Sequence, residues 1–188
     1  MRSRTSAESS DPFAAIRAGT DAHRARHRCG AHPFSDGRTL GVLAAAVDAK
    51  RILELGTALG YTALWLAHGA SAAQVDTIER DPEHVRLARE NFTAAGYGAR
   101  ITAHEGEFDA VLARLAPRYD MAFFDGFGPA LRQLERMRAL LRPRGVLISS
   151  NLDFGGETAD YRSRLADDTQ WLTVFALENG RTAISVKL

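Results

Sequence analysis

The sequence predicts one α/β domain built on a parallel sheet that ends in an antiparallel hairpin. The first observation is a regular alternation of short apolar runs with helical patterns between residues 37 and 150. The second is a turn with two glycines, Gly56 and Gly60, between one such run and a helix. The third is Asn179-Gly180, which lies between two strand-like runs and is a strong hairpin signal. Alternating strands and helices imply a parallel sheet that helices cover on both faces.

Length and composition limit the number of domains and the class of protein. With 188 residues and 45% hydrophobic content there is room for one core, so we expect a disordered tail over residues 1–11 and one domain over residues 12–188. A net charge of +1 gives no overall field that favours nucleic acid or a membrane. The single cysteine, Cys29, excludes an internal disulfide, and no apolar run approaches the roughly 20 residues of a membrane span. Because the N-terminus also lacks the apolar centre of a signal peptide, we expect a soluble cytoplasmic protein with no membrane partner.

Residues 12–36 are expected to form an N-terminal helix and a lid segment. Asp11 is a suitable N-cap and Pro12 a favourable first helical residue, which predicts a helix over Pro12–Arg28. The second half of this helix is strongly basic. Two interpretations stay open: a solvated helix face, or a lid over a cofactor or an acidic substrate.

The other elements follow in order along the chain. Apolar residues predict a helix over residues 37–48, and Asp81, Pro82 and Glu83 supply the N-cap, first proline and first-turn acid of a later helix. Strands are expected at residues 51–55, 75–79, 101–104, 121–125 and 145–150, with further helices at residues 61–68, 108–115 and 130–141. The hairpin is expected to pair residues 171–177 with residues 182–186.

The glycine turn indicates which ligand the sheet binds. A dinucleotide fingerprint needs three glycines as G-x-G-x-x-G, and only Gly56 and Gly60 are present here. The pattern E-x-G-x-x-x-G, which begins at Glu54, resembles motif I of the class I S-adenosylmethionine (SAM) dependent methyltransferases. Ligands of open parallel sheets lie beyond the carboxyl ends of the strands. Glu79 ends a strand about twenty residues after the turn, where a carboxylate can accept ribose hydroxyls.

Four segments are similar to the catechol and caffeoyl-coenzyme A O-methyltransferases and their bacterial relatives. They are residues 34–37, residues 53–56 with 60–62, residues 119–125, and residues 145–151 with 155–156. The resemblance covers residues 30–188 and implies a seven-stranded Rossmann-like fold, a small hydroxylated aromatic acceptor, and a homodimer. It places SAM on Glu54, Gly56, Thr57, Gly60, Tyr61, Thr62, Glu79, Arg80, Glu107, Phe108 and Asp125. In this interpretation Glu54 organises the loop or meets the ligand's amino group, Phe108 stacks on the adenine, and Glu107 accepts its amine.

The chain departs from this family at the metal site. The family binds Mg²⁺ or another divalent ion with an Asp after strand four and an Asp-Asn pair after strand five. Asp125 and Asn151 match, but Ser150 replaces the middle acid. A unit charge pair at about 4 Å is worth roughly 4 kcal/mol at an effective dielectric of about 20, so we expect a divalent ion to be held poorly unless Asp153 substitutes. Glycine at position 128 also replaces the family's lysine near the reacting hydroxyl.

These departures decide the functional hypotheses. Asp125 is the first candidate for the catalytic base and His32 the second, while His104 is expected only to flank the adenine. The leading hypothesis is a SAM-dependent O-methyltransferase for a small molecule. A SAM-binding protein that has lost methyl transfer is the alternative. An RNA methyltransferase rests only on the basic patch at residues 24–28, so nucleic acid is not an expected partner.

Overall fold

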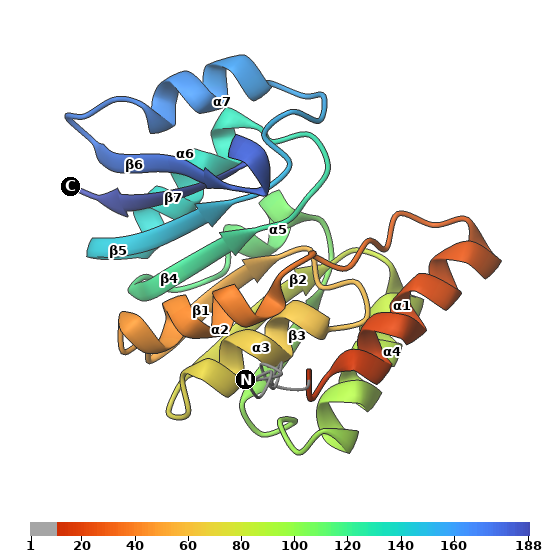
Figure 1. Ribbon diagram of the computed structural model, residues 1–188. Coiled ribbons are helices and arrows are strands. Elements are labelled where there is room, and N and C mark those ends of the chain that lie inside the picture. The colour runs from red at the N-terminus through yellow and green to blue at the C-terminus, as the bar shows by residue number, and fades with distance from the viewer. Residues whose placement is uncertain (1–10) are drawn as a thin grey trace, which may run out of the picture.

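The computed structural model describes residues 11–188, so all but Asp11 of the tail predicted over residues 1–11 lies outside them. The described chain forms a seven-stranded sheet in the order β3-β2-β1-β4-β5-β7-β6 (Figure 1). The strands are β1 (Arg51–Leu55), β2 (Gln74–Glu79), β3 (Ile101–Glu105), β4 (Tyr119–Phe124), β5 (Leu141–Ser149), β6 (Trp171–Leu177) and β7 (Thr182–Lys187). Strands β1 to β5 pair in parallel, whereas β7 lies antiparallel between β5 and β6. The predicted α/β sheet with a C-terminal antiparallel hairpin is confirmed.

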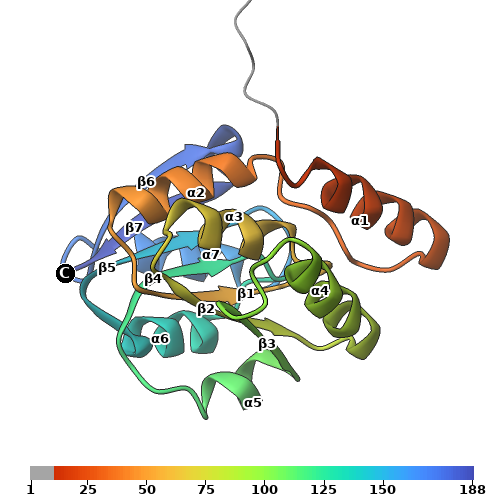
Figure 2. The ribbon, with the colours of Figure 1, turned by 90° about the horizontal axis from the view of Figure 1, so that it is seen from below.

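Helices cover both faces of this sheet. They are α1 (Ala14–His27), α2 (Gly37–Ala46), α3 (Tyr61–Gly69), α4 (Pro82–Ala94), α5 (Phe108–Leu112), α6 (Leu131–Leu140) and α7 (Thr158–Leu165). Helices α2, α3 and α4 lie on one face and α5 and α6 on the other, with α1 beside α4 (Figure 2). Within residues 11–188, every helix is too short or too polar to cross a bilayer.

Side-chain alternation along the central strands separates two cores. In β1, Ile52 packs in the cluster shared with α2, α3 and α4, whereas Leu53 and Leu55 pack in the cluster shared with α5, α6 and α7. All three side chains are fully buried. Successive strand residues point to opposite faces, so a strand buried on both sides must be apolar at nearly every position. The short apolar run in the sequence has this composition because it lies at the centre of the sheet.

The N-cap predicted at Asp81 is present, and a second N-cap occurs at Asp36. The Asp81 carboxylate accepts from the Glu83 backbone N–H at 2.9 Å and from that of His84 at 3.3 Å, and Pro82 begins α4. At α2, the Asp36 carboxylate accepts from the Thr39 backbone N–H at 3.0 Å. These contacts satisfy backbone donors that have no partner inside the helix.

The first helix begins later than the sequence predicted. It starts at Ala14 with Phe13 as N-cap, not at Pro12. The Asp11 carboxylate still accepts from the Phe13 backbone N–H at 2.8 Å, as an N-capping side chain does, but Pro12 and Phe13 form a turn ahead of the helix. The same carboxylate also accepts from the Tyr61 hydroxyl at 2.8 Å. Asp11, which the sequence placed in the tail, therefore contacts the domain.

Two predicted boundaries differ on the other face. Helix α5 ends at Leu112 instead of residue 115, and Pro117 follows, which disfavours helical backbone before it. Strand β5 begins at Leu141 instead of residue 145, because Leu141 already pairs with Tyr119 before an irregularity in the register. The backbone of Arg144 is left-handed there, with φ of 62°.

The C-terminal region contains one helix that the sequence did not predict. Helix α7 covers Thr158–Leu165, in a stretch between residues 150 and 171 for which the sequence predicts no element. Only Tyr161 and Leu165 of this helix are buried, so its apolar pattern is too sparse to recognise. The hairpin turn lies where it was predicted, between Leu177 and Thr182, and Glu178, Asn179 and Gly180 all adopt positive φ within it.

Candidate functional site

A cavity of about 470 Å³ opens at the carboxyl ends of the parallel strands. The loops after β1, β2, β3 and β4 form its wall together with the segment between α1 and α2. The wall includes Cys29, His32, Gly56, Glu79, Arg80, His84, Glu107, Phe108, Asp125 and Phe127. The expected convergence of these loops is therefore present, as the topology of open parallel sheets requires.

The glycine turn lies close to the loop after β4. Gly56 has φ of 103°, and a Cβ atom there would lie 2.9 Å from the Asp125 carbonyl oxygen. The Asp125 backbone N–H also donates to the Leu55 carbonyl at 2.8 Å. Only glycine combines this backbone angle with this close approach. The turn thus presents backbone instead of side chains to the cavity.

Glu79 connects the end of β2 to the glycine turn. Its Oε2 accepts from the Ala58 backbone N–H at 3.0 Å, and its Oε1 accepts from the backbone N–H groups of Arg80 at 2.9 Å and Asp81 at 3.0 Å. A carboxylate has about four acceptor positions, so three donors leave one for a ligand. The prediction that Glu79 accepts both ribose hydroxyls therefore requires one backbone contact to give way.

Glu54 lies beneath the turn and has no exposed surface. Its Oε2 accepts from the Thr77 hydroxyl at 2.5 Å, and Thr77 also contacts Thr57 at 2.5 Å. Its Oε1 is buried without a hydrogen-bond partner. Burial raises the pKa of Glu54 to about 8, although hydrogen bonds from Thr62 and Thr77 oppose the shift. These contacts fit the predicted role in organising the loop; direct contact with a ligand stays a prediction.

Replacing Glu54 with glutamine is expected to stabilise the protein at alkaline pH. The folded-state pKa of about 8 lies above the ordinary value of 4.5, so the folded state binds the extra proton and stability falls as pH rises between these values. Glutamine resembles the protonated acid and removes this loss. At pH 8.5 we expect a gain of at least about 1 kcal/mol, or roughly 2–4 °C in Tm, and little difference at pH 4.5. Thermal unfolding at both pH values tests this, and an equal difference at both would contradict it.

Asp125 follows β4 and lies at the centre of the cavity wall. Its Oδ1 accepts from the Ser150 hydroxyl at 2.5 Å and from the Asn151 amide at 3.2 Å. Burial raises the pKa of Asp125 to about 7, and the nearby Glu178 carboxylate raises it further while the two hydrogen bonds lower it. A carboxyl group with this pKa exchanges its proton near neutral pH, as a general base must.

The groups around Asp125 do not suit a divalent ion. Ser150 and Asn151 both direct donors at Asp125 Oδ1, and the Asn151 amide also donates to the Gly126 carbonyl at 3.1 Å. Mg²⁺ needs several oxygen ligands with lone pairs directed at it. Asp125 would offer a single charge, and Asp153 is exposed with no contact to Asp125. The predicted metal ligands Asp125 and Asn151 are thus adjacent, but they bind each other.

His32 lies at the rim of the cavity in an aromatic group. The Arg24 guanidinium donates to His32 Nδ1 at 2.6 Å, and the His32 ring packs edge-on against Phe127 at 6.1 Å. Burial and the Arg24 charge lower the pKa of His32. Phe127 in turn contacts Phe154 at 5.4 Å between ring centroids. Because Arg24 occupies a ring nitrogen, His32 is better suited to holding a ligand than to removing a proton; its catalytic role stays a prediction.

The other predicted cofactor residues divide into two groups. Arg80, Glu107 and Phe108 line the cavity as expected, and Arg80 lies 3.9 Å from Glu107. Thr57, Gly60, Tyr61 and Thr62 are buried and not on the wall. His104 also lies away from the cavity, with Nε2 2.7 Å from Asp76 Oδ1. Buried residues of the turn support its shape, and their direct contact with a cofactor stays a prediction.

Sequence reasoning did not identify several groups of the site. Cys29, His84 and Phe127 line the cavity, and Glu178 influences Asp125 from the C-terminal hairpin. His84 follows the Asp81 cap in the first turn of α4. Its place directly after the end of β2 could therefore have indicated that it lies at the site. Glu178 gave no signal, because its approach depends on the position of β7 beside β5.

The described fold and site define a protein of the Rossmann-like methyltransferase class. A sequence model described as "Methyltransferase domain" matches residues 53–151. The chain belongs to this methyltransferase-domain family.

A protein of Mycobacterium sp. (strain JLS), named "Putative O-methyltransferase", is 39% identical over 129 residues, which cover 66% of this chain and 58% of the relative. A protein of the same name from Mycobacterium marinum is 37% identical over 138 residues, 71% of this chain and 61% of the relative. The chain spans about 58% of the length of the first of these relatives.

Solved structures share the fold. The O-methyltransferase from Bacillus cereus in complex with SAH gives a TM-score of 0.77 at 22% identity, covering 93% of this chain and 91% of that chain. The O-methyltransferase TomG from Streptomyces achromogenes, which is involved in tomaymycin synthesis and was solved with SAM, gives 0.78 at 22% identity, covering 92% and 89%. At these identities the likeness establishes the fold.

Proposed function

We propose that the protein transfers a methyl group from SAM to a hydroxyl oxygen of a small aromatic molecule. The observation that carries this proposal is one shared cavity, whose wall includes Gly56, Glu79 and Asp125. A bare backbone turn, a strand-end carboxylate and a partly buried acid with a pKa of about 7 are the groups that cofactor binding and proton removal need. The relatives named O-methyltransferases support the same reaction.

The residues of the wall fit SAM. Gly56 lets the turn pass close to the backbone of Asp125, where a Cβ atom would not fit, and Glu79 keeps one acceptor position for a ribose hydroxyl. Phe108 offers a ring and Glu107 a carboxylate where the adenine is predicted. When bound, SAM supplies a methyl group activated by a positive sulfur. The solved neighbours named above carry SAM or SAH, which favours the same ligand here.

Exposed aromatic rings beside Asp125 favour an aromatic acceptor. Phe127 is 54% exposed and Phe154 is 57% exposed, although both are large apolar side chains. Their rings contact each other, and His32 contacts Phe127 from the opposite segment. Aromatic rings pack against one another in offset or edge-on arrangements. A small phenol held by these rings would lie at the rim of the cavity that Asp125 lines.

In this proposal Asp125 is the general base that removes the proton of the acceptor hydroxyl. The Asp125 carboxylate would take the proton of the acceptor hydroxyl as that oxygen receives the methyl group. SAM, when bound, would supply this methyl group and be released as SAH, so no further reactant is needed. Ser150 and Asn151 keep Asp125 Oδ1 in place, so Oδ2 is the oxygen available to the acceptor. Such assistance is typically worth about 10²–10⁴ in rate.

We further propose that the reaction needs no divalent ion at Asp125, since the donors there leave the ion too few ligands. Chelator is expected to leave methyl transfer intact. Ser150→Asp adds a second carboxylate beside Asp125 and is expected to create a Mg²⁺ site. Mg²⁺ should raise the Tm of Ser150→Asp and not of the unmodified protein. Activity that chelator abolishes and Mg²⁺ restores in the unmodified protein would contradict this.

The proposed function is tested by incubation with SAM and a panel of phenols and catechols. Formation of SAH together with a methylated product is the expected result. No SAH with any acceptor would count against it, and tight SAM binding without SAH would favour the alternative of a SAM-binding protein that has lost methyl transfer. The predicted homodimer and cytoplasmic location stay predictions.

A further inference from the structure

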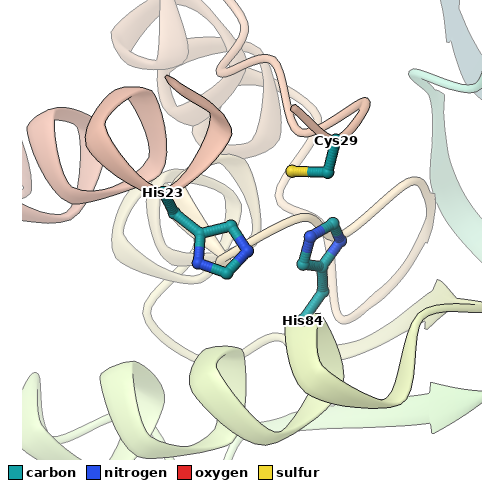
Figure 3. A group of neighbouring side chains, drawn as sticks. All are labelled: His23, Cys29 and His84. Carbon is teal, nitrogen blue, oxygen red and sulfur yellow. The ribbon is translucent and has the colours of Figure 1, made fainter. Parts of the chain in front are cut away.

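Three side chains that can bind metal meet beside the cofactor cavity. His23 comes from α1, Cys29 from the segment after that helix, and His84 from the first turn of α4. Figure 3 shows the three side chains pointing toward one another. One ligand atom from each lies within 4.8 Å of the other two. The methyl transfer described above uses none of them.

His84 supplies an independent sign of a missing ligand. Its side chain is 7% exposed, and its Nε2 is buried without a hydrogen-bond partner. The nearest carboxylate oxygen, Asp81 Oδ2, lies 3.9 Å from Nε2, which is beyond hydrogen-bond range. Buried polar atoms are nearly always paired, so an unpaired ring nitrogen facing a thiol and an imidazole indicates an absent partner.

The other ring nitrogen of His84 faces a carboxylate. Nδ1 lies 3.9 Å from Glu79 Oε1, and Asp81 adds a second negative charge beside the cluster. Histidines that bind metal commonly direct their second nitrogen at a carboxylate, which fixes the ring and strengthens the ligand. The surroundings of His84 therefore favour a cation at Nε2.

The types of ligand and the distances between them indicate which metal ion the cluster suits. Two imidazoles and one thiolate suit Zn²⁺, whereas Mg²⁺ and Ca²⁺ prefer oxygen ligands. Zinc bonds of about 2.0–2.3 Å place tetrahedral ligand atoms roughly 3.5 Å apart. The present separations of up to 4.8 Å therefore need to close by about 1 Å. His23 and Cys29 are only partly buried, so rotation of their side chains can provide this.

We propose that His23, Cys29 and His84 bind one Zn²⁺ ion and leave its fourth position open at the cavity edge. Because Cys29 and His84 both line the cavity, the ion would join the segment after α1 to α4 at its rim. The site thereby stabilises the wall that carries His32. This zinc site is separate from the Asp125 group and does not depend on the proposed methyl transfer.

His27 provides a matched control for the cluster. Its ring stacks on His23 with 4.3 Å between centroids, yet it is not among the three ligands. His27 is exposed and lies one turn along the same helix. Adventitious binding to surface imidazoles would involve His27 as much as His23, whereas the proposed site would not.

The test measures Zn²⁺ binding to the reduced, metal-free full chain without SAM. One equivalent is expected by competition with a chromophoric chelator, and Co²⁺ should give a thiolate charge-transfer band. Since Cys29 is the only cysteine, its reaction with a thiol reagent should slow at least about tenfold when Zn²⁺ binds. Cys29→Ser and His84→Asn should each weaken binding by about 100-fold or more, beyond what outer ligands usually contribute. His27→Asn should change it by less than about threefold, within the usual uncertainty of such comparisons.

The proposal is overturned if Zn²⁺ binds Cys29→Ser as tightly as the unmodified protein, or if saturating Zn²⁺ leaves the thiol reaction unchanged. It is also overturned if His27→Asn weakens binding as much as His23→Asn does. His84 is buried, so His84→Asn can fail to fold; the partly exposed His23 and Cys29 keep the test decisive in that case.

Discussion

Replacing Asp125 with alanine is expected to lower kcat for methyl transfer by about 10²–10⁴-fold. The side chain is the partly buried acid of the cavity wall whose pKa is raised to about 7, and the Ser150 hydroxyl donates to it at 2.5 Å. Removing it removes the proton acceptor while the glycine turn and Glu79 remain. We therefore expect the loss in kcat, with SAM affinity changed much less. Steady-state rates and calorimetric SAM binding measure the two quantities separately.

The raised pKa of Asp125 also predicts the direction in which kcat changes with pH. Only the ionised carboxylate accepts a proton, so kcat should rise with pH through about 7 and level off above it. Asp125→Asn keeps the shape of the side chain and should lose both the rate and this rise. Asp153→Ala is the matched control, because Asp153 is an exposed acid near Asn151 and should leave the rate unchanged. A full rate in Asp125→Asn would show that the proton goes elsewhere.

The sequence predicts the centre of the fold better than its edges. The bounds of β1 agree fully, because its buried positions Ile52, Leu53 and Leu55 form an apolar run and a glycine follows the strand. Helix α7 escapes prediction because only Tyr161 and Leu165 are buried in it. Helix α1 begins at Ala14, beyond the position that the local capping signal of Asp11 and Pro12 predicts, although the Asp11 carboxylate does accept from the Phe13 N–H. Local patterns suffice where burial is uniform, and they fail where one or two distant contacts decide.

The candidate site shows the same division. Motifs at strand ends placed Gly56, Glu79 and Asp125 on one cavity, since topology alone brings those ends together. They did not show that Glu54 lies under the turn, or that Ser150 donates to Asp125. The zinc cluster joins α1 to α4, and no spacing along the chain reveals it. Contacts between segments that a sheet does not connect depend on helix packing, which periodicity does not determine.

Replacing Glu79 with alanine is expected to weaken SAM binding by about tenfold to more than a hundredfold. Charge-assisted hydrogen bonds to the ribose are worth roughly 1.5–3 kcal/mol, which converts to this range. The change also releases the Ala58 N–H, which Glu79 Oε2 holds at 3.0 Å, so the glycine turn loses its connection to β2. Both effects lower affinity, and calorimetric titration with SAM measures their sum. Glu79→Gln separates the two effects in part. The glutamine side chain keeps one acceptor oxygen, but its NH₂ group faces backbone N–H groups that also donate.

Glu105→Ala is the matched control for Glu79. Glu105 ends β3 and pairs in register with Glu79, yet it is exposed and does not line the cavity. Its loss should leave SAM affinity within about twofold, because an exposed charge contributes little. If Glu79→Ala binds SAM as tightly as this control does, the ribose does not lie at the end of β2. If Glu79→Ala lowers the Tm but not the affinity of the folded fraction, then Glu79 serves the turn alone, and its three backbone contacts are its whole role.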